Sequence, residues 1–321
     1  MLTTLKRLLF IGAFVVILPR YSFASPAADG KLLPLVPPEV NIVAGVSDPH
    51  NATGHHLLVT IANSLELDDW LALTGVDNHR AVDQLMWLAA TSPRGSLREH
   101  ALLASGRFDR GHILRAARQN GAPITCYGGI DALIVQPFAR EQRAMNDLRW
   151  LAILDEQTAV FGTPWLVQRA IDRYTAHAST DAQLLRRIAP LHANVNSWDV
   201  LVLPTDPAAR HNAIAQLPSP WSELVDGADE LTIGIRYGAT TRIEFSIQPA
   251  SDRMASVSQP ADSLPPLIKT SRFPGAKTRV ENLAIVSGRV EGSLVMPQKQ
   301  FDACFRSRNS RPSPLLTAER K

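Results

Sequence analysis

The sequence has only two cysteines in 321 residues, Cys126 and Cys304. It contains no CxxC pair, which excludes a thioredoxin-like redox site and a zinc ribbon. The two thiols can form a disulfide in an oxidising compartment if the fold brings their Cα atoms within about 7 Å. They can equally remain two buried thiols, and the sequence leaves both alternatives open.

Common catalytic and phosphate-binding motifs are also absent. There is no GxSxG nucleophile turn, no HExxH pair, and no GxGxxG or GxxxxGKS loop. Adjacent acids occur at Asp68-Asp69 and Asp155-Glu156, where hydrated turns are the simpler interpretation. We therefore assign no catalytic residue and no cofactor, and we expect the chain not to be an enzyme. A site assembled from residues far apart in the sequence remains the alternative.

A basic excess on the folded body is missing as well. The chain has 33 Lys and Arg against 30 Asp and Glu, but Lys6, Arg7 and Arg20 lie in the first 24 residues. The remainder is formally neutral, and its last stretch, 306–321, holds five basic residues and one acid. Nucleic acid is bound by a basic face, so we predict no nucleic-acid partner. The segment 306–321 is interpreted as a disordered basic tail.

The N-terminal segment predicts export. Lys6 and Arg7 precede an apolar run from Leu8 to Leu18, and Ser22 and Ala24 suit cleavage after Ala24. The run is too short for the roughly 20 residues that span a membrane, and no later stretch predicts a transmembrane segment. We interpret 1–24 as a cleaved signal peptide and predict a periplasmic or extracellular protein.

Local patterns predict a series of hairpins and helices. Asp109 can cap a helix that ends at Gly121, and Pro164 suits the first turn of a second helix capped by Thr163. Gly128-Gly129 predicts the turn of a hairpin. Further elements are expected in strands at 39–46, 82–90, 99–106, 124–127, 131–135, 150–155, 158–161, 198–203, 231–237, 240–248, 282–287 and 290–296, and in helices at 55–65, 181–191, 250–268 and 298–305.

The order of these elements predicts an α+β fold, with two halves of antiparallel hairpins and helices packed on one face. The stretch 204–220 is rich in Pro, Ala and Asp, which is typical of a boundary. We predict an N-terminal α+β domain at 25–204 and a C-terminal α+β domain at 205–305.

Several short motifs resemble a family of exported bacterial proteins of unknown function. They are Ser105-Gly106-Arg107-Phe108-Asp109, Tyr127-Gly128-Gly129, Gly162 with Ala170-Ile171-Asp172-Arg173, and Trp198 with its strand. The similarity spans about residues 40–305. It implies an extracytoplasmic α+β protein and carries no catalytic residue over to this chain.

One cluster of side chains has the chemistry of metal ligands. Asp48, His50, His55 and His56 fall within nine residues around a short loop. Imidazole and carboxylate groups suit zinc or copper, although the spacing matches no known motif and solvated histidines at a helix start are the alternative.

Three functions remain open. The first is a non-catalytic binding or interaction protein, which contacts an unknown protein or a small apolar ligand through its sheet face or a cavity lined by Trp165, Trp198 or Trp221. The second is an extracytoplasmic hydrolase or metal-dependent enzyme. The third is an envelope-associated structural protein whose basic tail contacts anionic lipids.

Overall fold

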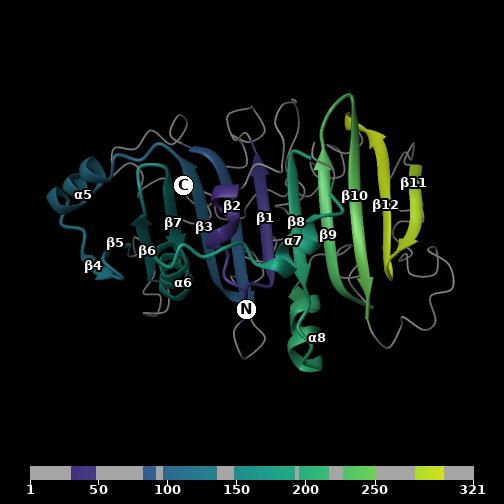
Figure 1. The fold of residues 1–321 in the computed structure, drawn as a ribbon, viewed down its shortest axis with the longest axis horizontal. Coiled ribbons are helices and arrows are strands. Elements are labelled where there is room, and N and C mark those ends of the chain that lie inside the picture. The colour runs from purple at the N-terminus through teal and green to yellow at the C-terminus, as the bar shows by residue number, and fades with distance from the viewer. Residues whose placement is uncertain are drawn as a thin grey trace, which may run out of the picture.

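The structure is a computed structural model that describes residues 30–47, 82–91, 97–135, 148–191, 195–216, 227–250 and 279–299. The strands in these ranges form one continuous antiparallel sheet of 12 strands (Figure 1). Their bounds in chain order are β1 Ile42–Ser47, β2 Val82–Thr91, β3 Leu97–Gly106, β4 Ile124–Tyr127, β5 Ile130–Val135, β6 Arg149–Ile153, β7 Thr158–Gly162, β8 Ser197–Val202, β9 Ala228–Arg236, β10 Thr240–Pro249, β11 Arg279–Val286 and β12 Arg289–Pro297.

The spatial order of the strands is β11-β12-β10-β9-β8-β1-β2-β3-β7-β6-β5-β4. Most neighbours are consecutive strands, but β3 pairs with β7, β1 pairs with β8 and β10 pairs with β12. The first strand therefore lies near the middle of the sheet, and β11 and β4 form its two edges.

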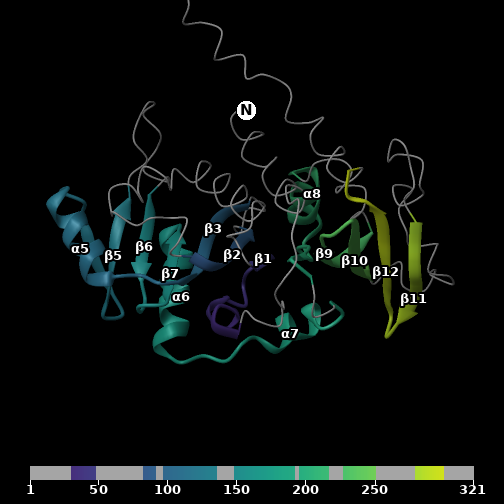
Figure 2. The ribbon, with the colours of Figure 1, turned by 90° about the horizontal axis from the view of Figure 1, so that it is seen from above.

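Helices lie on both faces of the sheet (Figure 2). Their bounds are η2 Leu33–Leu35, α5 Arg110–Gln119, α6 Pro164–Thr175, α7 Ala182–Ile188 and α8 Pro207–Gln216. On one face, which we call the α6 face, η2, α6 and α7 pack against residues such as Met86, Leu103 and Trp198. On the opposite α5 face, α5 and Ile214 of α8 pack against an apolar layer that includes Phe161, Ile233 and Phe245.

This architecture corrects the predicted fold class. We expected α+β halves with helices on one face only, and the structure has one sheet with helices on both faces. The prediction was wrong because β8 and β9, which flank Pro204, pair directly with each other in register. The supposed boundary stretch also contains helix α8. Whether 25–204 and 205–305 fold as separate units stays a prediction, although their strands share one sheet.

The individual elements agree with the sequence patterns more closely. Asp109 caps α5 by accepting a hydrogen bond from the His112 N–H at 2.8 Å, and Gly121 follows the helix with a φ of +72°. Gly128 and Gly129 both have positive φ and form the turn between β4 and β5. One detail differs, because the Thr163 side chain makes no capping bond to α6 and donates instead to the His100 carbonyl at 3.4 Å.

Candidate functional site

The predicted metal ligands Asp48, His50, His55 and His56 lie outside the described residues, as do Trp221, Cys304 and the basic tail. Within the described part of the chain, no group of three or more His, Cys, Asp or Glu side chains is arranged to hold a metal ion. No helix in those same ranges is long and apolar enough to cross a membrane.

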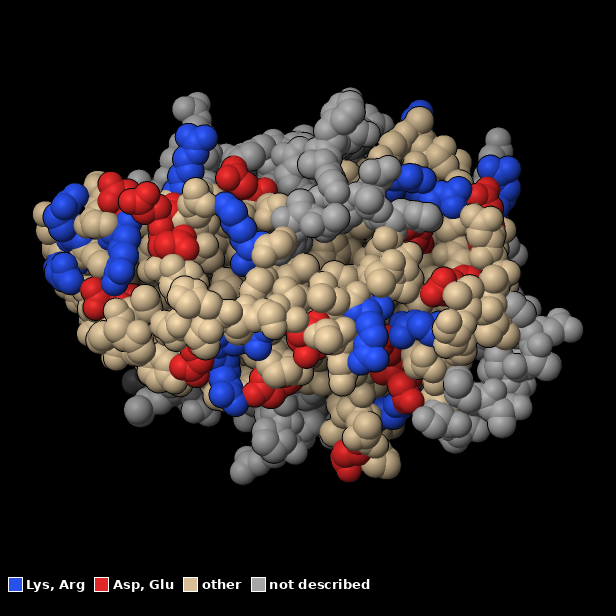
Figure 3. Space-filling view, in the orientation of Figure 1, with Lys and Arg blue, Asp and Glu red and all other residues tan. Residues whose placement is uncertain are grey.

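The main concentration of interacting charged side chains lies on the α6 face, over the strands that α6 does not cover. Each of these strands alternates polar residues on the α6 face with apolar residues on the α5 face, because successive side chains of a strand point to opposite faces. Figure 3 shows acidic and basic side chains side by side over this part of the surface. We call this group the polar ladder, and it consists of Glu230, Thr232, Arg242, Glu244, Ser246, Glu281, Arg289, Glu291 and Ser293.

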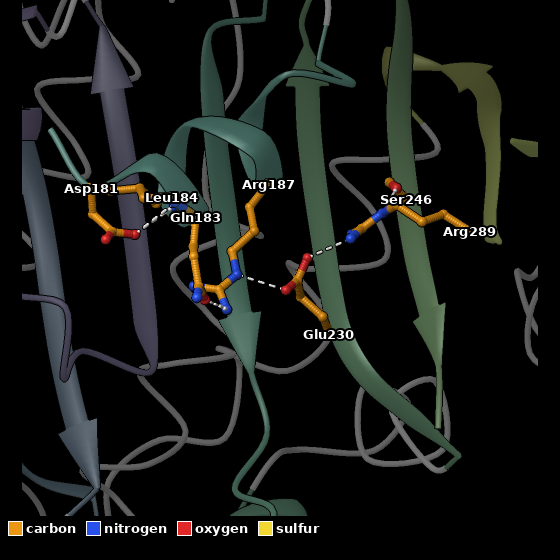
Figure 4. Close-up of polar contacts among 7 residues, drawn as sticks. All are labelled: Asp181, Gln183, Leu184, Arg187, Glu230, Ser246 and Arg289. Carbon is orange, nitrogen blue, oxygen red and sulfur yellow. Dashed lines mark hydrogen bonds and ion pairs between the residues drawn. The ribbon is translucent and has the colours of Figure 1, made fainter. Parts of the chain in front are cut away.

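Glu230 forms the centre of the polar ladder (Figure 4). Its Oε2 lies 2.6 Å from Arg187 Nε of α7, and its Oε1 lies 2.7 Å from Arg289 Nη1 of β12. The Glu230 side chain is only 12% exposed, and both arginines are largely buried. Low exposure strengthens such charge-assisted contacts. One carboxylate thus connects a helix, a central strand and a strand near the sheet edge.

A second ion pair lies next to the sheet edge. Arg242 Nη2 is 2.7 Å from Glu281 Oε2, and Arg242 Nη1 donates to Ser293 Oγ at 2.7 Å. Ser293 is buried, whereas Arg242 and Glu281 are partly exposed. This pair connects β10, β12 and the edge strand β11.

Hydroxyl groups underlie the first ion pair. Thr232 and Ser246 face each other across β9 and β10, and both are fully buried. Ser246 Oγ accepts a hydrogen bond from Arg289 Nε at 2.7 Å and donates to Glu291 Oε1 at 3.4 Å. Among the described residues, neither Thr232 Oγ1 nor Arg289 Nη2 has a hydrogen-bond partner.

The polar ladder has the character of a structural network. A serine nucleophile needs a base that removes its proton and a position that substrate can reach. Ser246 is fully buried, and the group that donates to it is an arginine, which remains protonated. The acid Glu230 is held by two cations and not by a group that it would deprotonate.

Sequence reasoning missed the polar ladder. The signal was present as period-two alternation, because Arg289, Glu291 and Ser293 alternate with Val290, Gly292 and Leu294. What the pattern could not supply was the partner of each charge. Glu230 and Arg289 come together only because β10 lies between their strands in the sheet order.

Comparisons with known proteins identify no family for this chain. No protein-family model matches the sequence, and no curated protein matches it. The chain is similar in structure to a solved protein described as "Structure of crystal form I of TP0453", with a TM-score of 0.45 and 10% sequence identity, over 87% of this chain and 98% of that chain.

The tryptophans proposed to line a cavity have other roles. Trp198 is 3% exposed and packs in the core of the α6 face. Trp165 is partly exposed at the start of α6, where the Arg169 guanidinium lies 5.9 Å from its ring centroid. Arg169 also contacts Glu39 at 2.7 Å. Neither tryptophan supports the apolar cavity that we expected.

The motifs that resemble the exported family serve packing and turns. A Cβ at Gly162 would lie 2.3 Å from the His100 carbonyl oxygen, so the close approach of β7 to β3 requires glycine there. Asp172 accepts a hydrogen bond from the Tyr127 hydroxyl at 3.2 Å, which ties α6 to β4 and raises the pKa of Tyr127. These residues therefore explain the fold and not a chemical activity.

Asp199 is an acid in the middle of the α5 face. On β8 it lies between Ala44 of β1 and Ile233 of β9, which are both buried apolar residues. Burial raises the pKa of its carboxyl group to about 8. At neutral pH this side chain is therefore largely protonated and uncharged.

Of the two alternatives that the sequence left open for Cys126, the buried thiol is wrong. Cys126 is free and exposed on the edge strand β4. None of the four residues of β4 is fully buried, because this short strand has only one partner strand, β5.

The opposite edge of the sheet exposes apolar residues. At the end of β11, Ala284, Ile285 and Val286 are all exposed, with Ile285 at 42% and Val286 at 45%. Edge strands of globular proteins are normally protected by charges, prolines or covering segments. This apolar edge, defined as Ala284 to Val286, is a surface on which another protein can dock.

Proposed function

We propose that this chain is an exported, non-catalytic interaction protein that contacts a protein partner along the apolar edge of β11. Export is supported by the signal sequence that ends at Ala24. Membership of the family of exported bacterial proteins that the motifs resemble is part of the same proposal.

The observation that carries the proposal is the contiguous exposure of Ala284, Ile285 and Val286 at the end of β11, a strand that has no outer partner among the described residues. An edge strand presents unpaired N–H and C=O groups, and these groups recognise an extended segment of another polypeptide. A small apolar ligand would need a cavity instead. The apolar side chains on both faces of the sheet are already buried against other parts of this chain. The exposed apolar surface of the sheet is therefore at its edge, which favours a protein partner.

A non-catalytic role is supported by the polar ladder. Two of its acids are engaged with arginines, Glu230 with Arg187 and Arg289 and Glu281 with Arg242, so that these charges neutralise one another within the fold. Such a network stabilises the arrangement of strands on which the edge depends.

Photocrosslinking in the producing cell tests this function. The chain is expressed with its own leader, and Val286 is replaced by a benzophenone amino acid. We expect crosslinked protein adducts at position 286. Leu185 of α7 is the matched control, since it is an equally exposed apolar residue at 46% on a different surface. Absence of adducts at 286, or the same adducts at 185, would contradict the proposal.

A further inference from the structure

The two halves of β11 differ in how they present the sheet edge. The first half carries Arg279, Glu281 and Asn282, and Glu281 forms an ion pair with Arg242 of β10, on the other side of β12. The second half, Ala284 to Val286, carries no charge. A bulge separates the halves, because the register with β12 shifts between Glu281 and Ala284, and Asn282 has a φ of +55°. The bulge limits strand pairing at this edge to the second half.

The second half is regular and has a defined outward side. Ala284, Ile285 and Val286 pair with Glu291, Val290 and Arg289 of β12. The turn between the strands is Ser287-Gly288, and both residues have positive φ, as in a two-residue hairpin turn. In such a hairpin the residues that flank the turn exchange backbone hydrogen bonds, so Val286 bonds inward. The N–H and C=O of the next residue, Ile285, then point to the open edge.

We infer that the apolar edge binds the same edge of a second copy of this chain, antiparallel, about a two-fold axis through Ile285. In antiparallel pairing, an outward-bonding residue must face an outward-bonding residue. The axis satisfies this rule by placing Ile285 opposite Ile285. Ala284 of each copy then faces Val286 of the other. This inference rests on the proposed function, because it names the partner of the same surface.

The composition of the edge favours a second copy over another partner. The exposed apolar stretch is three residues long, and the backbone N–H and C=O of its central residue point to the edge. A two-fold axis at this residue therefore lets each copy cover the whole stretch of the other. No charge lies in the stretch, so the symmetric contact brings no like charges together. Two-fold dimers are also the commonest assemblies of a single chain.

The contact is short, and this sets its strength. Three paired residues on each side bury far less than the roughly 1,200 Å² of a stable interface. We therefore expect a weak dimer that forms in a concentration-dependent way, with a dissociation constant of about 10 μM or weaker.

Sedimentation velocity of the mature chain measures the dimer over a range from about 10 μM to about 1 mM. We expect a shift from monomer to dimer in the unmodified chain. Ile285→Lys should remain monomeric, because two lysines would meet at the axis and repel each other. The matched control Leu185→Lys adds the same charge at an exposed apolar position of α7 and should dimerise as the parent does.

Disulfide trapping tests the register. In a background with Cys126→Ser and Cys304→Ser, Ile285→Cys should crosslink to itself under mild oxidation, since Cα atoms of a hydrogen-bonded pair lie about 5.5 Å apart. Ala284→Cys and Val286→Cys should crosslink when mixed, and much less when each is alone. Leu185→Cys should give no enriched dimer.

The outcomes separate this inference from the proposed function. A parent chain that stays monomeric at all concentrations, or a dimer unchanged by Ile285→Lys, overturns the second-copy inference. If photocrosslinks at position 286 then join the chain to a different protein, the proposed function stands with another partner. If position 286 gives no protein adduct and the chain is monomeric, both are overturned.

Discussion

The indole of Trp198 fills the space that a side chain at Gly45 would need. The two residues face each other across β1 and β8, and a Cβ at position 45 would lie 2.4 Å from the indole Nε1. On the other side, Trp198 faces Gly234 of β9, which is also a glycine. Both residues in register with Trp198 on the neighbouring strands are therefore glycines, which leaves room for the indole.

Gly45→Ala should destabilise the protein by about 1–3 kcal/mol, because the new methyl group forces the buried indole out of its position. The midpoint of urea unfolding measures this. Gly238→Ala is the control, since a Cβ there meets only the Thr240 carbonyl oxygen at 3.5 Å. That variant should be neutral or slightly more stable. Equal midpoints for the two variants would contradict the role of Gly45.

Glu230→Gln should destabilise the protein by about 3 kcal/mol, because Arg187 and Arg289 would keep their charges in a largely buried site without a counter-charge. The exposed pair of Glu39 with Arg169 provides a matched control, with the same chemistry at the surface. Glu39→Gln should cost less than about 1 kcal/mol. Urea unfolding of both variants compares them, and a cost at Glu230 no larger than at Glu39 would show that the network contributes little.

Asp199→Asn should change how stability depends on pH. The pKa of Asp199 is raised to about 8 in the folded chain, above its ordinary value of 3.8, so the folded state binds the proton more tightly than the unfolded state. Stability from this group is then intact below about pH 4 and is lost as pH rises from 4 to 8. Asparagine cannot lose a proton. Relative to the parent, the free energy of unfolding of the variant should therefore rise with pH, by up to about 1.4 kcal/mol per pH unit in that window.

Unfolding of the parent and of Asp199→Asn at pH 5, 6, 7 and 8 measures this difference directly. The contributions of other titrating groups are common to both chains and cancel. Parallel pH profiles would mean that the carboxyl group is ionised in the folded chain at neutral pH.

If the chain is exported as we propose, its mature form should begin at Ser25. The small residues Ser22 and Ala24 suit cleavage after Ala24, and intact mass spectrometry of the secreted protein identifies the new terminus. Replacing Ala24 by leucine should block cleavage, since the enzyme that removes signal peptides requires a small residue there. A secreted chain that still carries residues 1–24 would contradict the signal-peptide interpretation.

Local chemistry made most elements predictable, and long-range pairing did not. The Asp109 cap, the Gly121 stop and the Gly128-Gly129 turn each depend on residues within one or two turns of chain, and all three are confirmed. The order of the hairpins in the sheet depends on long-range pairs such as Leu102 with Phe161. The local sequence of either strand does not identify the strand that it will pair with. For this reason the elements predicted within the described residues were largely correct while the fold class was wrong. The helix predicted at 55–65, and most of those predicted at 250–268 and 298–305, lie outside the described residues and stay predictions.

The candidate site was hidden by the same limitation. The exposure of Ile285 follows from β11 being the last strand of the sheet, and an apolar β-branched residue in a strand is more often buried. The predicted cluster of Asp48, His50, His55 and His56 stays a prediction. Its four residues are close in sequence, but sequence proximity does not fix the direction in which ligands point.

The position of β1 in the sheet has a consequence for biogenesis. Among the strands that the structure describes, β1 is the first to be synthesised, and one of its two edges is completed only by β8, about 150 residues later. Until residue 202 has emerged, that edge can pair with any other strand, including one from a neighbouring nascent chain. The sheet is therefore completed late in synthesis, because the open edge of β1 must wait for β8 before the two halves of the sheet can join.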